Sequence, residues 1–373
     1  MRVQKYEISR AIDRLKNVID RNPAFPALDG ILIKDRYFTG SNAELTVQIK
    51  SEACGPMDEF ILPSRAFDLI RSLPDGEVEI TADSSNVVTV RTGRTRNRYQ
   101  SFTPADYTLY QPQMDFENGI TISGESLMNA FGNVVHAADK RSVKQVLQGV
   151  FVGKAEDGVD VVGSDGHMMA WDKIPHEAEG MIEAIVPRTA VEKIISLGII
   201  DDVTITYNVR SIIFRSSEFI VSSRLIDGKY PDFKRFFGMD LPIHVEIDKK
   251  ELINAMNRAK LSMVDASGVK KPAVVTILED TCEISIASSL GDYKEDLGVQ
   301  SDIHEPFVIG LNPIVMLDSI KAFGDGRIRL KCINGKSPVF MEQEGSKFQT
   351  MVLPVAIDTR VTKTEEEKGE SNE

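Results

Sequence analysis

Residues 61–70 read ILPSRAFDLI, an apolar strand end followed by a proline and the start of a helix. The same order returns at residues 185–194 as IVPRTAVEKI, and at residues 310–318 as GLNPIVMLD, where the proline is displaced by one position. Proline is favoured in the first turn of a helix, because its missing N–H group would have no partner there. The pattern therefore predicts three equivalent strand-to-helix junctions at near-equal intervals.

A second pattern also occurs three times, as an apolar residue, a four-residue gap and an amphipathic helix. The copies begin at Val3, Ile122 and Ile247, which lie 119 and 125 residues apart. Asp248 stands where an N-cap oxygen accepts the first free backbone N–H groups, as does Ser123 in the second copy. Each helix carries one apolar stripe at i, i+4, i+7 and i+11. The stripes are Ile8, Ile12, Leu15 and Ile19; Leu127, Phe131, Val134 and Ala138; and Leu252, Met256, Ala259 and Met263.

Short alternating or β-branched runs lie between these helices and are typical of strands, such as residues 78–81, 86–90, 203–206 and 328–330. Each block of about 120 residues, a common domain size, therefore holds two half-repeats of one helix plus antiparallel strands. The alternative is chance similarity, but two independent patterns recur in the same order. The sequence predicts an α+β fold of three similar domains. Their expected bounds are residues 1–117, 118–240 and 241–358, followed by a disordered acidic tail at 359–373.

Composition limits the class of protein. A hydrophobic fraction of 42% and a charged fraction of 27% are typical of soluble globular chains. No apolar run reaches the roughly 18 residues of a membrane helix, and the first residues lack a signal-peptide pattern. Cys54, Cys282 and Cys332 have no metal-type spacing, so we expect buried thiols in a reducing cytoplasm. The net charge of −12 argues against a uniformly basic nucleic-acid binder, although the distribution of charge matters more than its total.

Several strings resemble the bacterial DNA sliding clamp, the β subunit of DNA polymerase III, in order and in interval. They are SDGHMMA at 164–170, VPR at 186–188, SRLIDGKYPDF at 223–233, LNP at 311–313 and LPV at 353–355. The resemblance covers about residues 1 to 358. It implies a non-catalytic, cofactor-free processivity subunit that acts in the cytoplasm with the nucleoid. It also implies that two chains close head to tail into a six-domain ring around duplex DNA, with helices lining the hole.

A ring would account for the acidic net charge, because its inner helices need to be basic while its outer surface can be acidic. Contacts between these basic helices and DNA phosphates would be independent of DNA sequence. For each residue, the alternative is that it lies on the solvent-exposed face of an ordinary soluble helix and has no role in DNA binding. The expected DNA-binding residues, with Lys16 and Lys260 as further candidates, are Arg14, Arg21, Arg65, Arg71, Lys140, Arg141, Lys144, Arg188, Lys193, Lys249, Lys250, Arg258 and Lys321.

The resemblance also implies an apolar cleft between the second and third domains. There the polymerase catalytic subunit, clamp loader subunits and other proteins with clamp-binding motifs dock short extended peptides. Methionine lets such a surface repack around several ligands, while the alternative for each Met or Val is ordinary core. Carried over residue by residue, the cleft is Leu147, Ser164, Gly166, His167, Met168, Met169, Pro231, Arg235, Phe236, Pro338, Met351, Val352, Leu353, Pro354 and Val355.

Two positions depart from the family pattern. The family commonly has Arg where Met168 stands, and a basic residue close behind the LPV string, where Ala356 follows. We therefore expect partner peptides that are less acidic or more apolar than usual. The acidic tail is further expected to compete weakly with acidic partner peptides.

Enzyme interpretations fit the sequence less well. Ser164, Asp165 and His167 are hydrolase residue types, but neighbours in one string cannot converge as a catalytic triad does, so the string predicts a turn at Gly166. The five histidines lack metal-ligand spacing, and no phosphate-binding glycine loop occurs. A nuclease would need clustered carboxylates, which are not apparent. The alternative from another class is a repeat-built scaffold that never encircles DNA.

In a dimer, Leu261 and Met263 are expected to meet the strand at residues 99–102.

Overall fold

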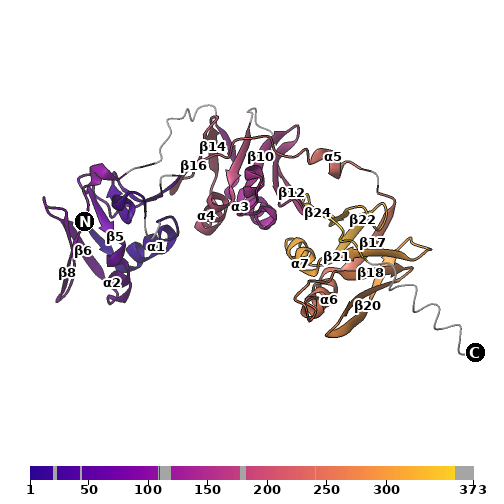
Figure 1. Ribbon diagram of the computed structural model, residues 1–373. Coiled ribbons are helices and arrows are strands. Elements are labelled where there is room, and N and C mark those ends of the chain that lie inside the picture. The colour runs from indigo at the N-terminus through magenta and orange to yellow at the C-terminus, as the bar shows by residue number, and fades with distance from the viewer. Residues whose placement is uncertain are drawn as a thin grey trace, which may run out of the picture. The chain divides into compact units, whose positions relative to one another are not determined.

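The computed structural model describes residues 1–19, 23–42, 44–107, 109, 119–176, 182–239 and 241–357. Arg21 and the acidic tail, both part of the sequence-based expectations, lie outside these residues. Contacts within the chain define two compact units, and Figure 1 labels the helices and strands from which they are built. Unit 1 comprises residues 1–131, 151–159 and 174–229, and unit 2 comprises residues 132–150, 160–173 and 230–373.

Helices follow both repeated patterns, but of the three prolines expected in a first turn, Pro313 alone lies there; Pro63 and Pro187 are the last residues of the preceding strands. Asp248 accepts the backbone N–H groups of Lys250 and Glu251 at 2.9 and 3.0 Å, which confirms it as an N-cap. Ser123 Oγ accepts the N–H of Ser126 at 3.4 Å. The α-helices of the described residues are α1 (Lys5–Leu15), α2 (Phe67–Ser72), α3 (Gly124–Val134), α4 (Arg188–Leu197), α5 (Lys234–Phe237), α6 (Lys249–Ser262) and α7 (Pro313–Lys321).

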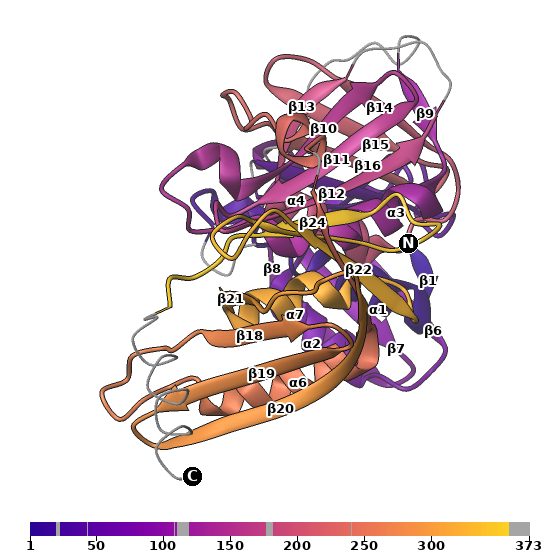
Figure 2. The same cartoon turned by 90° about the vertical axis from the view of Figure 1, so that its right-hand side faces the viewer.

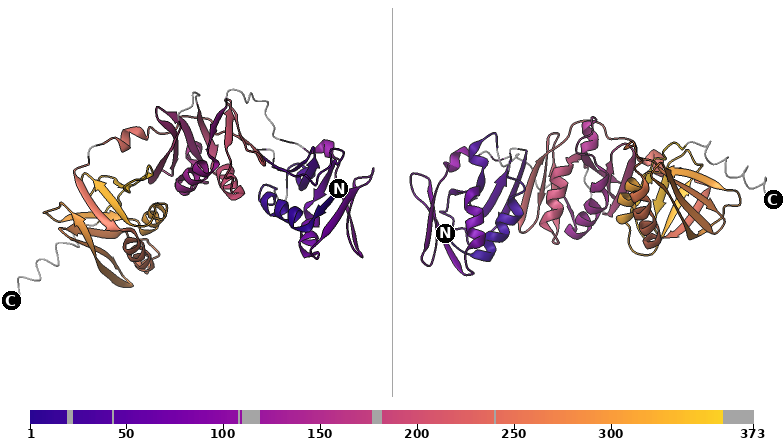
Figure 3. Two further views of the ribbon diagram at one scale, coloured as in Figure 1. Left: turned by 180° about the vertical axis from the view of Figure 1, so that it is seen from behind. Right: turned by 60° about the horizontal axis from the view of Figure 1, so that its bottom comes forward.

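Unit 1 contains two antiparallel sheets, and α1 and α2 pack against each other (Figure 3). The stripe of Ile8, Ile12 and Leu15 on α1 is fully buried, as its spacing predicts. One sheet has the order β1 (Arg2–Gln4), β6 (Glu77–Ala82), β7 (Val87–Thr92) and β8 (Thr95–Gln100). The other has the order β5 (Phe60–Pro63), β2 (Gly30–Lys34), β3 (Tyr37–Ser41), β4 (Leu45–Lys50), β16 (Phe219–Arg224), β15 (Ser211–Arg215), β14 (Val203–Tyr207) and β9 (Ile120–Ile122).

Unit 2 is built on a longer run of antiparallel strands, and α6 lies along β19 and β20 while packing against α7 (Figure 2). The strand order is β12 (Met168–Pro175), β24 (Gln349–Val352), β23 (Val339–Glu342), β22 (Arg327–Cys332), β17 (Ile243–Asp248), β20 (Gly291–Ser301), β19 (Thr281–Ser288), β18 (Ala273–Leu278) and β21 (Phe307–Leu311). The central segment also forms β10 (Gly149–Ala155), β11 (Gly158–Ser164) and β13 (Glu183–Pro187). The antiparallel pairing confirms the predicted α+β fold class.

The three cysteines are buried and unbridged, as predicted. Burial raises the pKa of each thiol to about 12, so none is poised as a nucleophile. Among the described residues, every helix is too short or too polar to cross a membrane.

Candidate functional site

Two strings that the sequence places in one binding surface are adjacent in the structure. β12 pairs with β24, so that Met168 faces Val352 and Met169 faces Met351 in register. The pairing continues past β24, because the backbone N–H of Leu353 donates to the carbonyl oxygen of His167 at 2.8 Å. Two segments that are far apart in the sequence thereby form one continuous surface within unit 2.

The string at residues 164–167 is a turn, as predicted. Gly166 has φ +89°, a conformation that favours glycine. Asp165 Oδ1 accepts the backbone N–H groups of His167 and Met168, each at 2.7 Å, and Ser164 Oγ donates to the Met168 carbonyl at 2.8 Å. The polar side chains of this string thus hold their own backbone and do not form a catalytic relay.

Many of the expected cleft residues belong to the interior. Met168, Met169, Met351 and Val352 are all buried, and so are Leu147 and Ser164. For the two methionines of β12, the ordinary-core interpretation therefore describes the packing better than an open wall does. Pro231, Pro338 and Pro354 are half-buried.

A smaller set of the expected residues is exposed: Gly166, and five residues with side chains that we call the docking surface. It includes two apolar side chains that follow β24, together with an aromatic and a basic side chain on α5. Its members are His167, Arg235, Phe236, Leu353 and Val355. Exposed apolar side chains beside charged ones are typical of interaction sites.

Sequence reasoning missed the side chains that support this surface. Phe233 and Phe237 flank the indole of Trp171, with ring centroids 5.4 and 5.2 Å away, and Phe237 also meets Phe340 of β23 at 5.6 Å. Asp160 of β11 is buried beside them. An acidic residue inside the apolar string VDVVG was an available signal for Asp160, whereas the aromatic contacts join segments too far apart in sequence to predict.

The expected DNA-binding residues fall into groups with different surroundings. Lys140, Arg141 and Lys144 were expected on a helix, but they are exposed in the loop between α3 and β10. Arg65 is exposed in a 3-10 turn before α2 and donates to the Gln100 carbonyl at 3.1 Å. Lys250 is exposed in the first turn of α6. Exposed cations of this kind can reach phosphate oxygens.

Other expected DNA-binding residues are engaged in contacts inside their unit. Arg71 pairs with Asp13 and Asp68, Arg188 with Glu192, Arg258 with Glu295, Lys321 with Asp318 and Lys16 with Asp13. The hydrogen bonds that Arg258 donates to the Glu295 carboxylate raise the pKa of Arg258. Lys249 Nζ donates to the Phe323 carbonyl. A phosphate contact at these positions would have to compete with an existing partner.

Lys193 was expected to face DNA, and the structure places it in the interior instead, with 6% of its surface exposed. Burial lowers its pKa to about 8, and the nearby charges of Arg14 and Lys16 add to the shift. Arg14 is half-buried, stacks over the Phe219 ring at 4.9 Å and donates to the Leu197 carbonyl at 3.4 Å. Burial also lowers the pKa of Arg14.

The expected dimer contact is corrected in one respect. Leu261 is exposed and available to a second chain, but Met263 is buried within unit 2. The strand they were expected to meet ends at Gln100, so Phe102 lies beyond it, where its side chain is exposed. No cluster of His, Cys, Asp or Glu among the described residues could hold a metal ion.

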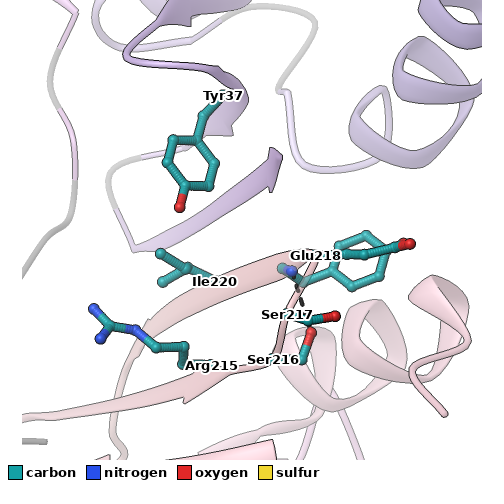
Figure 4. A pocket seen from close by; sticks show the side chains of 7 residues that line it. Tyr37, Arg215, Ser216, Ser217, Glu218 and Ile220 are labelled. Atoms are coloured by element: carbon teal, nitrogen blue, oxygen red, sulfur yellow. Dashed lines mark hydrogen bonds between the residues drawn. The ribbon is translucent and has the colours of Figure 1, made fainter. Parts of the chain in front are cut away.

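A hollow of about 280 Å³ lies beside the pair of β4 and β16, lined by Tyr37 and residues 215–220 (Figure 4). The Tyr37 ring points into it from one side, and Arg215 and Ile220 border it from the other. Its volume lies below the roughly 300 Å³ at which small-molecule sites begin. We therefore assign it no ligand.

Known proteins share both the sequence and the fold of this chain. Models of the N-terminal, central and C-terminal domains of the DNA polymerase III beta subunit match residues 1–111, 121–232 and 234–356. A beta sliding clamp of Staphylococcus aureus is 24% identical, over 94% of this chain and 97% of the relative. One of Chlamydia trachomatis is also 24% identical, over 94% and 86%.

Solved structures show the same fold. The Bacillus subtilis sliding clamp has a TM-score of 0.86 and 20% identity, covering 96% of this chain and 99% of that one. A Pseudomonas aeruginosa sliding clamp bound to griselimycin has a TM-score of 0.87 and 19% identity, with coverages of 96% and 99%.

Three clamp-domain matches in succession, on a fold shared with clamps over nearly its whole length, define a DNA sliding clamp, a class of non-catalytic processivity factors. Within that class, the chain belongs to the bacterial DNA polymerase III β-subunit family.

Proposed function

We propose that two copies of this chain close head to tail into a ring around duplex DNA and tether the replicative polymerase in the cytoplasm, at the nucleoid. The observation that carries this proposal is the succession of three clamp-domain matches over residues 1–356. A closed ring stays on DNA through its topology, so its contacts with phosphates can be few and exchangeable. An acidic chain with a net charge of −12 is therefore compatible with this role.

Two strand edges support the head-to-tail joint. Within the described residues, nothing pairs with the outer edge of β8, and residues 291–297 of β20 pair with β19 alone. Arg96 and Arg98 are exposed on β8, while Asp292 and Asp296 are exposed on β20. Open strand edges readily add a strand from another chain, and opposite charges favour one register. We propose that β8 of each chain pairs with β20 of the other.

The phosphate contacts that we propose are the exposed cations Arg65, Lys140, Arg141, Lys144 and Lys250. Three of them lie in one loop, which lets them adapt to a moving backbone. The residues already held in ion pairs contribute mainly to the local field around the DNA.

We propose that the docking surface receives an extended peptide of the polymerase catalytic subunit, of clamp loader subunits and of other clamp-binding proteins, in competition. Its apolar side chains Phe236, Leu353 and Val355 suit apolar peptide side chains, and Arg235 suits a peptide carboxylate. We propose further that griselimycin, which is bound to the Pseudomonas aeruginosa clamp, binds this surface as well.

Loading onto circular and linear DNA tests the ring directly. With a clamp loader and ATP, the chain should remain on nicked circular duplex through gel filtration and leave the same DNA once a restriction enzyme linearises it. Light scattering should give twice the mass of the 41.4 kDa chain. A monomer that dissociates equally from both DNA forms would contradict the proposal and favour the scaffold alternative.

A further inference from the structure

Asp160 carries a carboxylate into the interior of unit 2. Only 1% of its side chain is exposed, yet both of its oxygens have partners. Oδ1 accepts the indole N–H of Trp171 at 3.0 Å, and Oδ2 lies 2.9 Å from Lys234 Nζ. One buried acid therefore joins β11, β12 and the first residue of α5.

α5 depends on contacts of this kind, because a helix of four residues has almost no stability of its own. Its Phe237 packs against Trp171 and Phe340, and the residue before the helix, Phe233, also packs against the indole. The ammonium group of Lys234 also lies 5.7 Å from the centre of the Phe233 ring. These contacts leave Arg235 and Phe236, which belong to the docking surface, exposed between the anchors.

This ion pair is a weak source of stability, because Asp160 loses its hydration on burial while Lys234 stays more than half exposed to water, which screens the attraction. An apolar side chain at position 160 would avoid this loss of hydration. What the ion pair does supply is a defined geometry, since the carboxylate has two oxygens and each has one partner at a fixed place.

We propose that Asp160 and Lys234 are positioning residues for the docking surface: their ion pair holds α5 in the orientation in which Arg235 and Phe236 meet a bound peptide. This inference rests on the proposed role of the docking surface. Without the pair, α5 samples other orientations, and the apparent dissociation constant rises in inverse proportion to the fraction of time that α5 is in place. A helix in place for a tenth of the time binds about tenfold more weakly.

Substitution of Lys234, whose side chain is more than half exposed, tests the proposal without opening the core. Lys234→Met keeps the length of the side chain and removes its charge, and Lys234→Arg restores the charge. Asp160→Asn keeps an oxygen for Trp171 and removes the charge that attracts Lys234. The matched control is Lys34→Met, which breaks the 2.7 Å pair with Glu59 in unit 1.

Griselimycin is the probe, and its dissociation constant is measured by calorimetry on the full-length chain. Leu353→Ala is included because its weakening of binding places the probe on the docking surface. We expect Lys234→Met and Asp160→Asn to bind about tenfold more weakly, with Lys234→Arg and Lys34→Met close to the unsubstituted chain. Trp171, the one tryptophan of the chain, supplies a second readout. Its emission should shift to longer wavelength in Lys234→Met, because a displaced α5 uncovers the indole.

The outcomes separate the two proposals. Failure of the unsubstituted chain to bind, or unchanged binding by Leu353→Ala, would overturn the docking surface and this inference with it. If the unsubstituted chain binds and Leu353→Ala does not, equal affinity in Lys234→Met would overturn the positioning role alone. Equal loss of affinity in Lys234→Arg and Lys234→Met would also overturn it, because the charge would then be irrelevant.

Discussion

The sulfur of Met168 lies 3.5 Å from the hydroxyl of Ser319, which donates a hydrogen bond to it across 151 residues of chain. Both side chains are buried, and Ser319 belongs to α7. The family position that commonly carries Arg is here turned inward onto a helix. A charge is thereby absent from the docking surface, while β12 gains a contact with α7.

Met168→Leu should lower the stability of unit 2 by about 1 to 2 kcal/mol, because it leaves the buried Ser319 hydroxyl without this acceptor. Trp171 fluorescence during urea unfolding measures the effect. The double variant with Ser319→Ala should recover most of the loss, since the polar group is then gone. A double variant less stable than Met168→Leu alone would show that the hydrogen bond contributes nothing.

Lys193→Met should stabilise unit 1 by about 2 kcal/mol at pH 7, because the buried ammonium group is replaced by an apolar chain. The folded pKa of about 8 lies below the ordinary value of 10.5. Between these values the unfolded chain binds more protons, so the stability of the unsubstituted chain rises with pH. The advantage of the variant is therefore complete below pH 8 and disappears above pH 10.5.

Thermal unfolding at several pH values checks this expectation, with exposed Lys260→Met as the control. A gain that stays constant to pH 11 or beyond would refute the burial argument. Affinity for DNA should remain unchanged in Lys193→Met, because the amine does not face solvent.

Charge reversal at the strand edges should weaken the dimer. Arg96→Glu with Arg98→Glu places acidic side chains against Asp292 and Asp296 of the other chain, and like charges across a joint cost several kcal/mol. Sedimentation at micromolar concentration should then detect monomers. Adding Asp292→Lys and Asp296→Lys to the same chain should restore the dimer. If the quadruple variant is as monomeric as the double variant, the pairing of β8 with β20 is ruled out.

Loss of loop cations should change how DNA affinity depends on salt. Arg141→Ala and Lys144→Ala should each lower the slope of log affinity against log salt concentration by about 0.9, the value for one phosphate contact. A short linear duplex at low ionic strength is the substrate, because topology then plays no part. Lys34 forms an ion pair with Glu59 in unit 1, and Lys34→Ala should leave the slope unchanged. If Arg141→Ala and Lys144→Ala both keep the slope of the unsubstituted chain, the loop does not contact DNA phosphates.

Periodicity in the sequence predicted α1, α3 and α6, since one-sided stripes such as Ile8, Ile12 and Leu15 allow only one packing face, but it did not predict α5. The family resemblance placed Met168 in the open cleft, and its burial could not be read from alternation, because a strand covered on both faces carries apolar residues at every position. Lys193 could have been found: it lies three residues after Ala190 and four before Leu197, on the buried stripe of α4. The family resemblance outweighed that signal.

The support of the docking surface could not be derived in the same way. Trp171, Phe237 and Phe340 come from three segments, and their contact follows from the sheet register and not from any local pattern. Asp160 was open to suspicion as a charge in an apolar string, but its partner Lys234 was not.

The pairing of β4 with β16 has a mechanical consequence. Five consecutive residue pairs, from Leu45 with Ser223 to Ile49 with Phe219, join the segment matched by the N-terminal clamp model to that matched by the central one. Separating these segments would require breaking the backbone hydrogen bonds between β4 and β16 together. In the proposed ring of two chains, the interface between β8 and β20 can open without breaking the hydrogen bonds within either chain's own sheets. We therefore expect a loader that opens the ring to act on that interface.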